Sequence, residues 1–191
     1  MVGETIAMTV KNYFEDNASV YDKKRSKGFL GWLRNNERKA VLALVDIKKN
    51  ETVLDAGCGE GYYAQLVKLL GAKPFGIDLA PEMIARLKQK GIPGKVCDLE
   101  NFSLGKKFDK IICAGVLEFT NNTDKVIVML AKHLQPRGKL ILLYSRPSPG
   151  TLAYVFIHRF HGLSLQIISR KRLQNLLKHA GLKITTHRKL P

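Results

Sequence analysis

The sequence contains little cysteine, no long apolar run and, over its last third, no acidic side chain. Its 191 residues include three cysteines, Cys58, Cys97 and Cys113, without a C-x-x-C spacing. This excludes a disulfide framework, and we expect reduced thiols, no metal site and a cytoplasmic protein. No apolar run approaches the roughly 20 residues of a membrane span, and residues 1–9 lack the pattern of a signal peptide.

The acidic residues are confined to one part of the chain. All 16 lie between Glu4 and Asp124, whereas the 67 residues after Asp124 contain 13 Lys and Arg. With a net charge of +16, this uneven distribution favours an anionic partner: peripheral contact with an anionic membrane, nucleic acid or an acidic substrate. A solvated basic surface that only aids solubility is the alternative.

A glycine-rich turn lies in the first third of the sequence. The apolar residues 52–54 predict a buried strand that ends in Asp55, and glycines follow at positions 57, 59 and 61 before an amphipathic helix. Glycines at such a turn let a ligand approach the backbone, and the helix N-terminus offers free N–H groups. The G-x-G-x-G spacing differs from the dinucleotide fingerprint G-x-G-x-x-G, and Asp55 favours a ligand amine over a phosphate.

This stretch, D-A-G-C-G-E-G after a strand, resembles the first motif of class I S-adenosylmethionine-dependent methyltransferases, and the resemblance covers about residues 13–143. It implies S-adenosyl-L-methionine as cofactor and methyl transfer as the activity. It also implies a doubly wound, Rossmann-like α/β fold whose mostly parallel sheet has the order 3-2-1-4-5-(7)-6. The alternation of predicted strands and helices supports that architecture. A Rossmann-like binder of another nucleotide is the alternative.

The resemblance implies cofactor contacts at the carboxyl ends of four strands. Asp78 would bind two ribose hydroxyls, with Leu79 and Met83 beside the adenine. Asp98 would bind the adenine amino group, and the backbone N–H of Leu99 a ring nitrogen. Asp78 as a helix N-cap and Asp98 as a turn residue are the alternatives. The complete expected set is Asp55, Ala56, Gly57, Cys58, Gly59, Asp78, Leu79, Met83, Asp98, Leu99, Gly115 and Val116.

Four residues are candidates for acid–base chemistry on the acceptor side. Glu118 follows the fourth strand, where many relatives carry Leu-Glu-His; here the next residue is Phe119, so that histidine is absent. Tyr21 lies in a segment that resembles the N-terminal segment of small-molecule methyltransferases, and His158 and His161 lie in an apolar stretch. For each, packing, loop ordering or surface exposure is the alternative.

The chain is predicted to form one methyltransferase domain. Residues 135–138 predict a turn, 139–144 a fifth strand and 182–186 a sixth, while the seventh strand of the family has no counterpart up to residue 191. Residues 151–168, which precede the last helix, have three possible roles. They would cover the acceptor, lie on a membrane surface or pack against the core as a helix. The expected divisions are an N-terminal helical cap at 1–50, a cofactor-binding core at 51–145, a substrate lid at 146–168 and a C-terminal helix and strand at 169–191.

For the acceptor, a small or lipid-like molecule methylated on oxygen or carbon, such as a quinone precursor, is the first expectation. It follows from the N-terminal segment, the apolar stretch and the basic last third. An RNA methyltransferase is the second, although no N-P-P-[YF] motif follows the fourth strand. A non-catalytic module that binds S-adenosylmethionine is the third.

Overall fold

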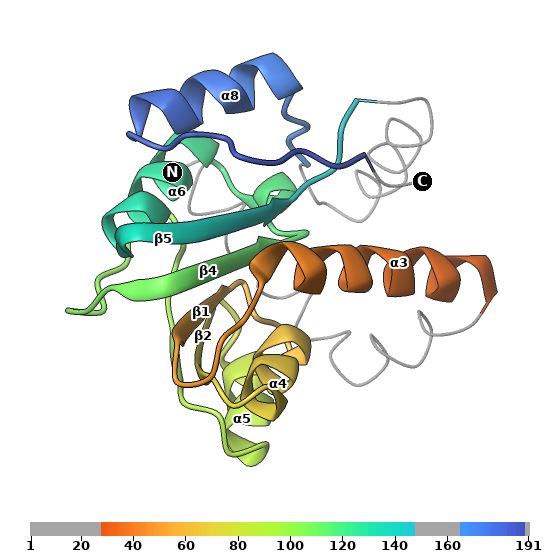
Figure 1. Cartoon of the computed structure of the whole chain (residues 1–191), viewed down its shortest axis with the longest axis vertical. Helices are drawn as coiled ribbons and strands as arrows, with labels where there is room; N and C mark the ends of the chain where they lie inside the picture. The colour runs from red at the N-terminus through yellow and green to blue at the C-terminus, as the bar shows by residue number, and fades with distance from the viewer. Residues whose placement is uncertain (1–27, 148–164, 190–191) are drawn as a thin grey trace.

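The computed structural model describes residues 28–147 and 165–189 and shows an α/β fold with helices on both faces of one sheet (Figure 1). The sheet is five-stranded and parallel, in the order β3-β2-β1-β4-β5. Its strands are β1 (Thr52–Ala56), β2 (Lys73–Asp78), β3 (Gly94–Val96), β4 (Phe108–Ala114) and β5 (Leu134–Leu143). The helices are α3 (Gly28–Val45), α4 (Tyr62–Leu69), α5 (Pro81–Gln89), the short 3₁₀ helix η1 (Leu117–Phe119), α6 (Thr123–Lys132) and α8 (Arg170–His179).

Alternate strand residues pack against different helices, because successive side chains of a strand point to opposite faces. Val53 of β1 packs with Val41 and Val45 of α3 and with α4. Its neighbour Leu54 lies in the opposite cluster with α6. The C-terminal α8 then packs on α6 through Leu173. The doubly wound architecture and the strand order 3-2-1-4-5 expected from the sequence are therefore confirmed.

The strand order reverses at β1, which pairs with β2 on one side and with β4 on the other. The connections leaving β1 and β4 therefore run to opposite faces, and a crevice opens at the carboxyl ends of these strands. In open α/β sheets this crevice is where ligands bind. The glycine turn follows β1 directly and so lies at that position.

The fifth strand starts earlier than predicted. Leu134 already pairs with Phe108, and the next register pair is Lys110 with Lys139. Residues 135–138, predicted as a turn, therefore form an irregularity inside β5, and Arg137 has a left-handed φ of 66°. Proline and glycine here bulge the strand without reversing it, since its partner β4 continues alongside.

The predicted sixth strand at residues 182–186 is wrong. Residues 182–189 belong to no strand, and Ile184 is 41% exposed. Only Leu182 packs inward, and its N–H bonds the carbonyl of Leu177 at the end of α8. A strand needs a hydrogen-bonded neighbour, and within the described residues β5 is the last strand of the sheet on this side.

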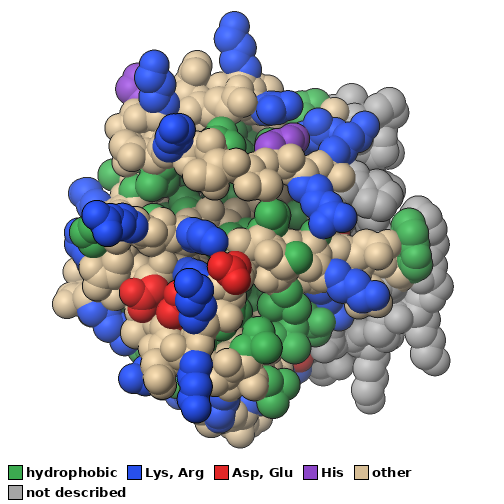
Figure 2. Space-filling view, in the orientation of Figure 1, with side chains coloured by type: hydrophobic (Ala, Val, Ile, Leu, Met, Phe, Trp, Pro, Cys, Tyr) green, Lys and Arg blue, Asp and Glu red, His purple; other side chains and the backbone are tan. Residues whose placement is uncertain are grey.

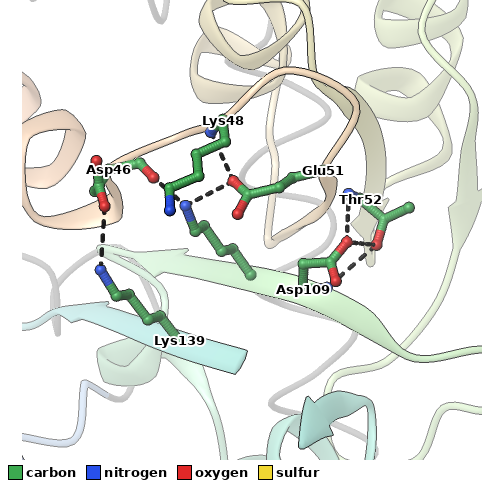
Figure 3. A network of polar contacts seen from close by, with 7 residues as sticks. Asp46, Lys48, Glu51, Thr52, Asp109 and Lys139 are labelled. Atoms are coloured by element: carbon green, nitrogen blue, oxygen red, sulfur yellow. Dashed lines mark hydrogen bonds and ion pairs between the residues drawn. The ribbon is translucent and has the colours of Figure 1, made fainter. Parts of the chain in front are cut away.

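A polar network ties the α3–β1 connection to β4, at the strand ends opposite the glycine turn (Figure 3). Lys110 is 4% exposed. Its Nζ lies 2.6 Å from Glu51 Oε2 and also donates to the carbonyl of Asp46. Asp109 accepts hydrogen bonds from the N–H and the hydroxyl of Thr52, at 2.8 and 2.7 Å. The buried cation is thus satisfied, and the network is structural.

Candidate functional site

The glycine turn between β1 and α4 is shaped by two different constraints. Gly57 and Gly59 have φ values of 72° and 51°, in the left-handed region that favours glycine. A Cβ on Gly57 would lie 2.2 Å from Cγ2 of Val116, so the loop after β4 packs directly on the turn. A Cβ on Gly59 would meet nothing within 4 Å. Gly57 is therefore required by packing, whereas Gly59 faces open space.

Asp55 stabilises the turn through a buried contact with the start of α4. Its side chain is 2% exposed, and Oδ2 accepts a hydrogen bond from the N–H of Ala64 in α4, at 3.0 Å. Burial raises the pKa of Asp55 to about 7, the Ala64 N–H opposes this increase, and the nearby Asp78 adds to it. This carboxyl group holds the helix start, and it does not line the cavity where a ligand amine was expected.

Asp78, the last residue of β2, connects the turn to α5. Its Oδ2 accepts from the N–H of Gly59 at 2.8 Å, and its Oδ1 from that of Ala80 at 3.0 Å. Burial raises the pKa of Asp78, and these backbone bonds oppose the shift. The N-cap of α5 is Ala80, so the N-cap alternative for Asp78 is wrong. A carboxylate oxygen can accept more than one hydrogen bond, so both oxygens of Asp78 keep capacity for ribose hydroxyls.

A cavity of about 1700 Å³ lies at this edge of the sheet and continues along the whole length of β5, as far as its first residue, Leu134. It brings together most of the residues expected at the cofactor; Asp55 and Ala56 do not line it. Those that do are Gly57, Cys58, Gly59, Asp78, Leu79, Met83, Asp98, Leu99, Gly115 and Val116. Residues from four strand ends thus meet at one cavity, as the sequence predicted.

Asp98 and Leu99 follow β3 at the far end of this cavity. Oδ1 of Asp98 accepts from the N–H of Glu100 at 2.9 Å, which is a turn contact. The Asp98 side chain is exposed and Leu99 is buried. The turn-residue alternative is therefore confirmed for Asp98, and it is compatible with a contact to a ligand in the cavity.

Cys58 lines the cavity within the turn, and its Sγ lies 3.5 Å from the carbonyl of Gly59. Burial and the charges of Asp55 and Asp78 raise the pKa of this thiol, so it stays protonated. Cys58, Cys97 and Cys113 are all free thiols, as expected. Within the described ranges, His, Cys, Asp and Glu form no group suited to a metal ion.

Glu118 lies in η1 and is 6% exposed. Its Oε1 accepts from the N–H of Ser145, just after β5, and its backbone carbonyl accepts from the N–H of Gln166 at 2.8 Å. These contacts support the alternative that Glu118 orders its loop. The other acid–base candidates, Tyr21, His158 and His161, lie outside the described residues.

An aromatic and a basic residue that the sequence did not single out also line the cavity. The guanidinium of Arg38 in α3 lies 3.6 Å from the ring centre of Tyr62, the first residue of α4. Tyr63 also lines the cavity, and burial raises the pKa of its hydroxyl. The tyrosines directly after the third glycine were the available signal, but the position of Arg38 requires the packing of α3 on the sheet.

Comparison with known proteins identifies the class that this fold and site define. Residues 29–187 match the methyltransferase domain family, and the chain belongs to that family. One relative is a dTDP-4-amino-2,3,4,6-tetradeoxy-D-glucose N,N-dimethyltransferase of Saccharopolyspora spinosa, 27% identical over 74% of this chain and 59% of that protein. Another is a demethylmenaquinone methyltransferase of Tropheryma whipplei, 30% identical over 72% of this chain and 60% of that protein.

A solved structure shares the fold across nearly the whole chain. It is the magnesium protoporphyrin IX methyltransferase of Synechocystis with bound S-adenosylhomocysteine, with a TM-score of 0.74 and 21% identity, over 97% of this chain and 95% of that one. At this identity the likeness concerns the fold. The chain spans only about 60% of the length of the two curated relatives.

Proposed function

We propose that this chain binds S-adenosyl-L-methionine and transfers its methyl group to a small-molecule acceptor. The observation that carries the proposal is the contact between Gly59 and Asp78, which joins the glycine turn after β1 to the acid at the tip of β2. The pair presents a left-handed glycine and an acidic side chain at the same cavity. A ribose with two free hydroxyls and no phosphate beside it fits this pair better than a pyrophosphate does.

The order of the strand ends gives the direction in which the cofactor would lie. Asp98 and Leu99 after β3 would hold the adenine, Asp78 after β2 the ribose, and the glycine turn after β1 the methionine part. The reactive methyl group would then face the ends of β4 and β5.

When bound, the cofactor supplies a methyl group already activated by the sulfonium charge. The tasks left to this chain are to orient the acceptor in line with the methyl–sulfur bond and to exclude water. Gly57 packs closely against Val116, and this contact fixes the position of the glycine turn that lines the cavity. A base is needed only for an acceptor that must lose a proton.

We further propose that the acceptor is small or lipid-like and is methylated on oxygen or carbon, a quinone precursor being the leading example. The demethylmenaquinone methyltransferase relative supports this choice. The cavity also supports it, because beyond the cofactor residues it continues along apolar residues at its β5 end, namely Leu140, Leu142 and Leu182. Such a lining suits a ring or an isoprenoid chain.

Calorimetric titration of S-adenosylmethionine and S-adenosylhomocysteine into the purified chain tests the proposal. We expect micromolar binding to the wild type and none to Asp78→Ala. The matched control is Asp109→Ala, an acid bonded to Thr52 at the opposite strand ends, which should bind both ligands normally. A folded wild type that binds neither ligand, or an Asp78→Ala variant with unchanged affinity, would refute the assignment.

A basic surface next to the cavity supports peripheral contact with anionic membranes as a second proposal. The exposed bases at the α8 end, here called the basic end, are Arg170, Lys171, Arg172, Lys178, Lys183, Arg188 and Lys189. Only Arg172 has an ion pair with an acid among the described residues, Asp124 at 3.2 Å. Figure 2 shows Lys and Arg side chains over the α8 region, with the visible acids lying elsewhere. Several of these bases also line the cavity, so lipid headgroups would face its mouth.

Vesicle co-sedimentation tests this second proposal. We expect binding to phosphatidylglycerol vesicles but not to phosphatidylcholine vesicles, weakening with salt as screened charges require. Lys171→Glu with Lys178→Glu should reduce binding, whereas Lys73→Glu with Lys88→Glu, the same change at exposed sites outside the basic end, should reduce it less. Salt-independent binding would contradict the electrostatic account. Tight RNA binding without vesicle binding would favour an RNA substrate instead. None of the described helices is long and apolar enough to cross a bilayer.

A further inference from the structure

One oxygen of Glu118 is buried without a hydrogen-bond partner. Its Oε1 is bonded to the N–H of Ser145, whereas Oε2 is inaccessible to solvent and has no partner in the described part of the chain. The residue is 6% exposed and lines the large cavity. Buried carboxylate oxygens normally accept hydrogen bonds, because an unsatisfied one loses its hydration without compensation. The free oxygen is therefore a candidate to accept a hydrogen bond from a ligand that enters the cavity and displaces the atoms now covering it.

The position of Glu118 places this oxygen on the acceptor side of the cavity. Val116, two residues earlier, packs on Gly57 and marks the boundary with the cofactor turn. Glu118 reaches away from that boundary to Ser145, which follows β5. Since the cofactor would extend from β3 to β1, a group that bridges β4 and β5 lies beyond its methionine end.

The backbone around Glu118 holds the oxygen in place. The N–H of Gln166 bonds the carbonyl of Glu118, and the Gln166 side chain donates to the carbonyl of Asn121 at 2.8 Å. Together with the Ser145 contact, these bonds join the chain leaving β5 and the chain entering α8 to one loop. The carboxylate itself is held by the Ser145 contact and the Glu118 backbone by the Gln166 contact, so the side chain is pre-organised for a ligand.

We propose that Oε2 of Glu118 binds the methyl acceptor by accepting a hydrogen bond from an O–H or N–H group, so that the acceptor carries a hydroxyl or amine. This rests on the proposed methyltransferase function and adds the acceptor class and its binding residue. An acceptor with only ether, carbonyl or hydrocarbon groups leaves the oxygen unsatisfied and binds more weakly. The carboxylate selects for a donor, as sites built to hydrogen-bond a hydroxyl select against analogues that lack it.

The test compares catechol with its dimethyl ether, 1,2-dimethoxybenzene, which has the same ring and oxygen atoms but no O–H donor. Binding of each to the S-adenosylhomocysteine complex of the full chain is measured by ligand-observed NMR titration. The variant is Glu118→Gln, whose amide oxygen still accepts from Ser145 but whose NH₂ replaces the free acceptor. Glu100→Gln is the control, since Glu100 also accepts from loop N–H groups, those of Asn121 and Asn122.

We expect the wild type and Glu100→Gln to prefer catechol by about tenfold or more, the range of one hydrogen bond to a charged group. Glu118→Gln should lose that preference while binding S-adenosylhomocysteine within about threefold of wild type. The preference is a ratio within one variant, so a partly unfolded sample cannot produce its loss.

Two results would overturn the proposal. One is a wild-type complex that binds catechol no better than the ether, or not saturably; Oε2 would then accept no hydrogen bond from the ligand. The other is a preference that survives in Glu118→Gln. Failure of the wild type to bind S-adenosylhomocysteine is a separate result that refutes the methyltransferase assignment itself, and with it the acceptor role of Glu118.

Discussion

Replacing Asp55 by Asn should remove a pH dependence of stability that the buried carboxyl group creates. In the folded chain burial raises the pKa of Asp55 from 3.8 to about 7. A raised pKa means that the contribution to stability is fully present below the unfolded value and is lost as the pH rises through the folded value. Asparagine keeps an oxygen for the Ala64 N–H, at 3.0 Å in the wild type, and does not ionise.

The size of the effect follows from the two pKa values. Between pH 5 and pH 8 the wild type should lose about 2–3 kcal/mol of unfolding free energy relative to Asp55→Asn, at about 1.4 kcal/mol per pH unit until the folded group titrates. Urea unfolding followed by circular dichroism at half-unit pH steps measures the difference directly, because other titrating groups are common to both chains.

A difference that stays constant from pH 5 to pH 8 would refute this reasoning, since it would mean that Asp55 has an ordinary pKa and is solvated. Asp109→Asn is the control of opposite sign. Hydrogen bonds from Thr52 lower the pKa of Asp109. Its contribution is present above the unfolded value and is lost only as the pH falls through the folded value, so its difference from wild type should not change over this range.

Further predictions concern the turn and the buried network. Gly57→Ala should destabilise the chain by about 2 kcal/mol or more, since its Cβ would lie 2.2 Å from Val116 Cγ2, and Val116→Ala should restore part of the loss in thermal unfolding. Gly59→Ala should cost only about 1–2 kcal/mol, because its Cβ meets nothing within 4 Å, yet weaken S-adenosylhomocysteine binding at least tenfold by calorimetry; equal affinity would place the ligand elsewhere. Glu51→Ala should cost about 3 kcal/mol in urea unfolding by leaving Lys110 buried without its carboxylate, and a second change, Lys110→Met, should recover much of it; additive losses would contradict the coupling.

The fold was largely predictable from the sequence because the buried parallel strands appear as apolar runs. Residues 108–114, F-D-K-I-I-C-A, are an apolar run of the kind that predicts a buried strand, and they form β4. Ser169 is a typical N-cap residue before the amphipathic residues 170–179, and its hydroxyl accepts from the N–H of Arg172 at 3.3 Å. In both places a local signal and the tertiary structure agree.

The two incorrect secondary-structure predictions concern segments whose conformation depends on the neighbouring strand and not on their own composition. Residues 135–138 have the composition of a reversing turn, but β4 pairs on either side of them and keeps β5 running in one direction. Residues 182–186 have the composition of a strand, but they lack a hydrogen-bonded partner in the described chain. Neither outcome follows from composition, because both depend on which strand lies alongside.

The two acids of the site show what strand geometry adds to a motif. Both Asp55 and Asp78 were expected at the ligand, yet only Asp78 lines the cavity. Asp55 has the same parity in β1 as Val53, which packs against the α3 and α4 face, so its carboxyl group must point under α4, where it meets the N–H of Ala64. Asp78 is the last residue of β2, and its carboxylate reaches the N–H of Gly59 in the turn. Counting alternate residues from Val53 would have assigned Asp55 to the helix start. Of the two acids, Asp78 is then the one available to a ribose. Asp78→Ala is therefore the sharper test of cofactor binding.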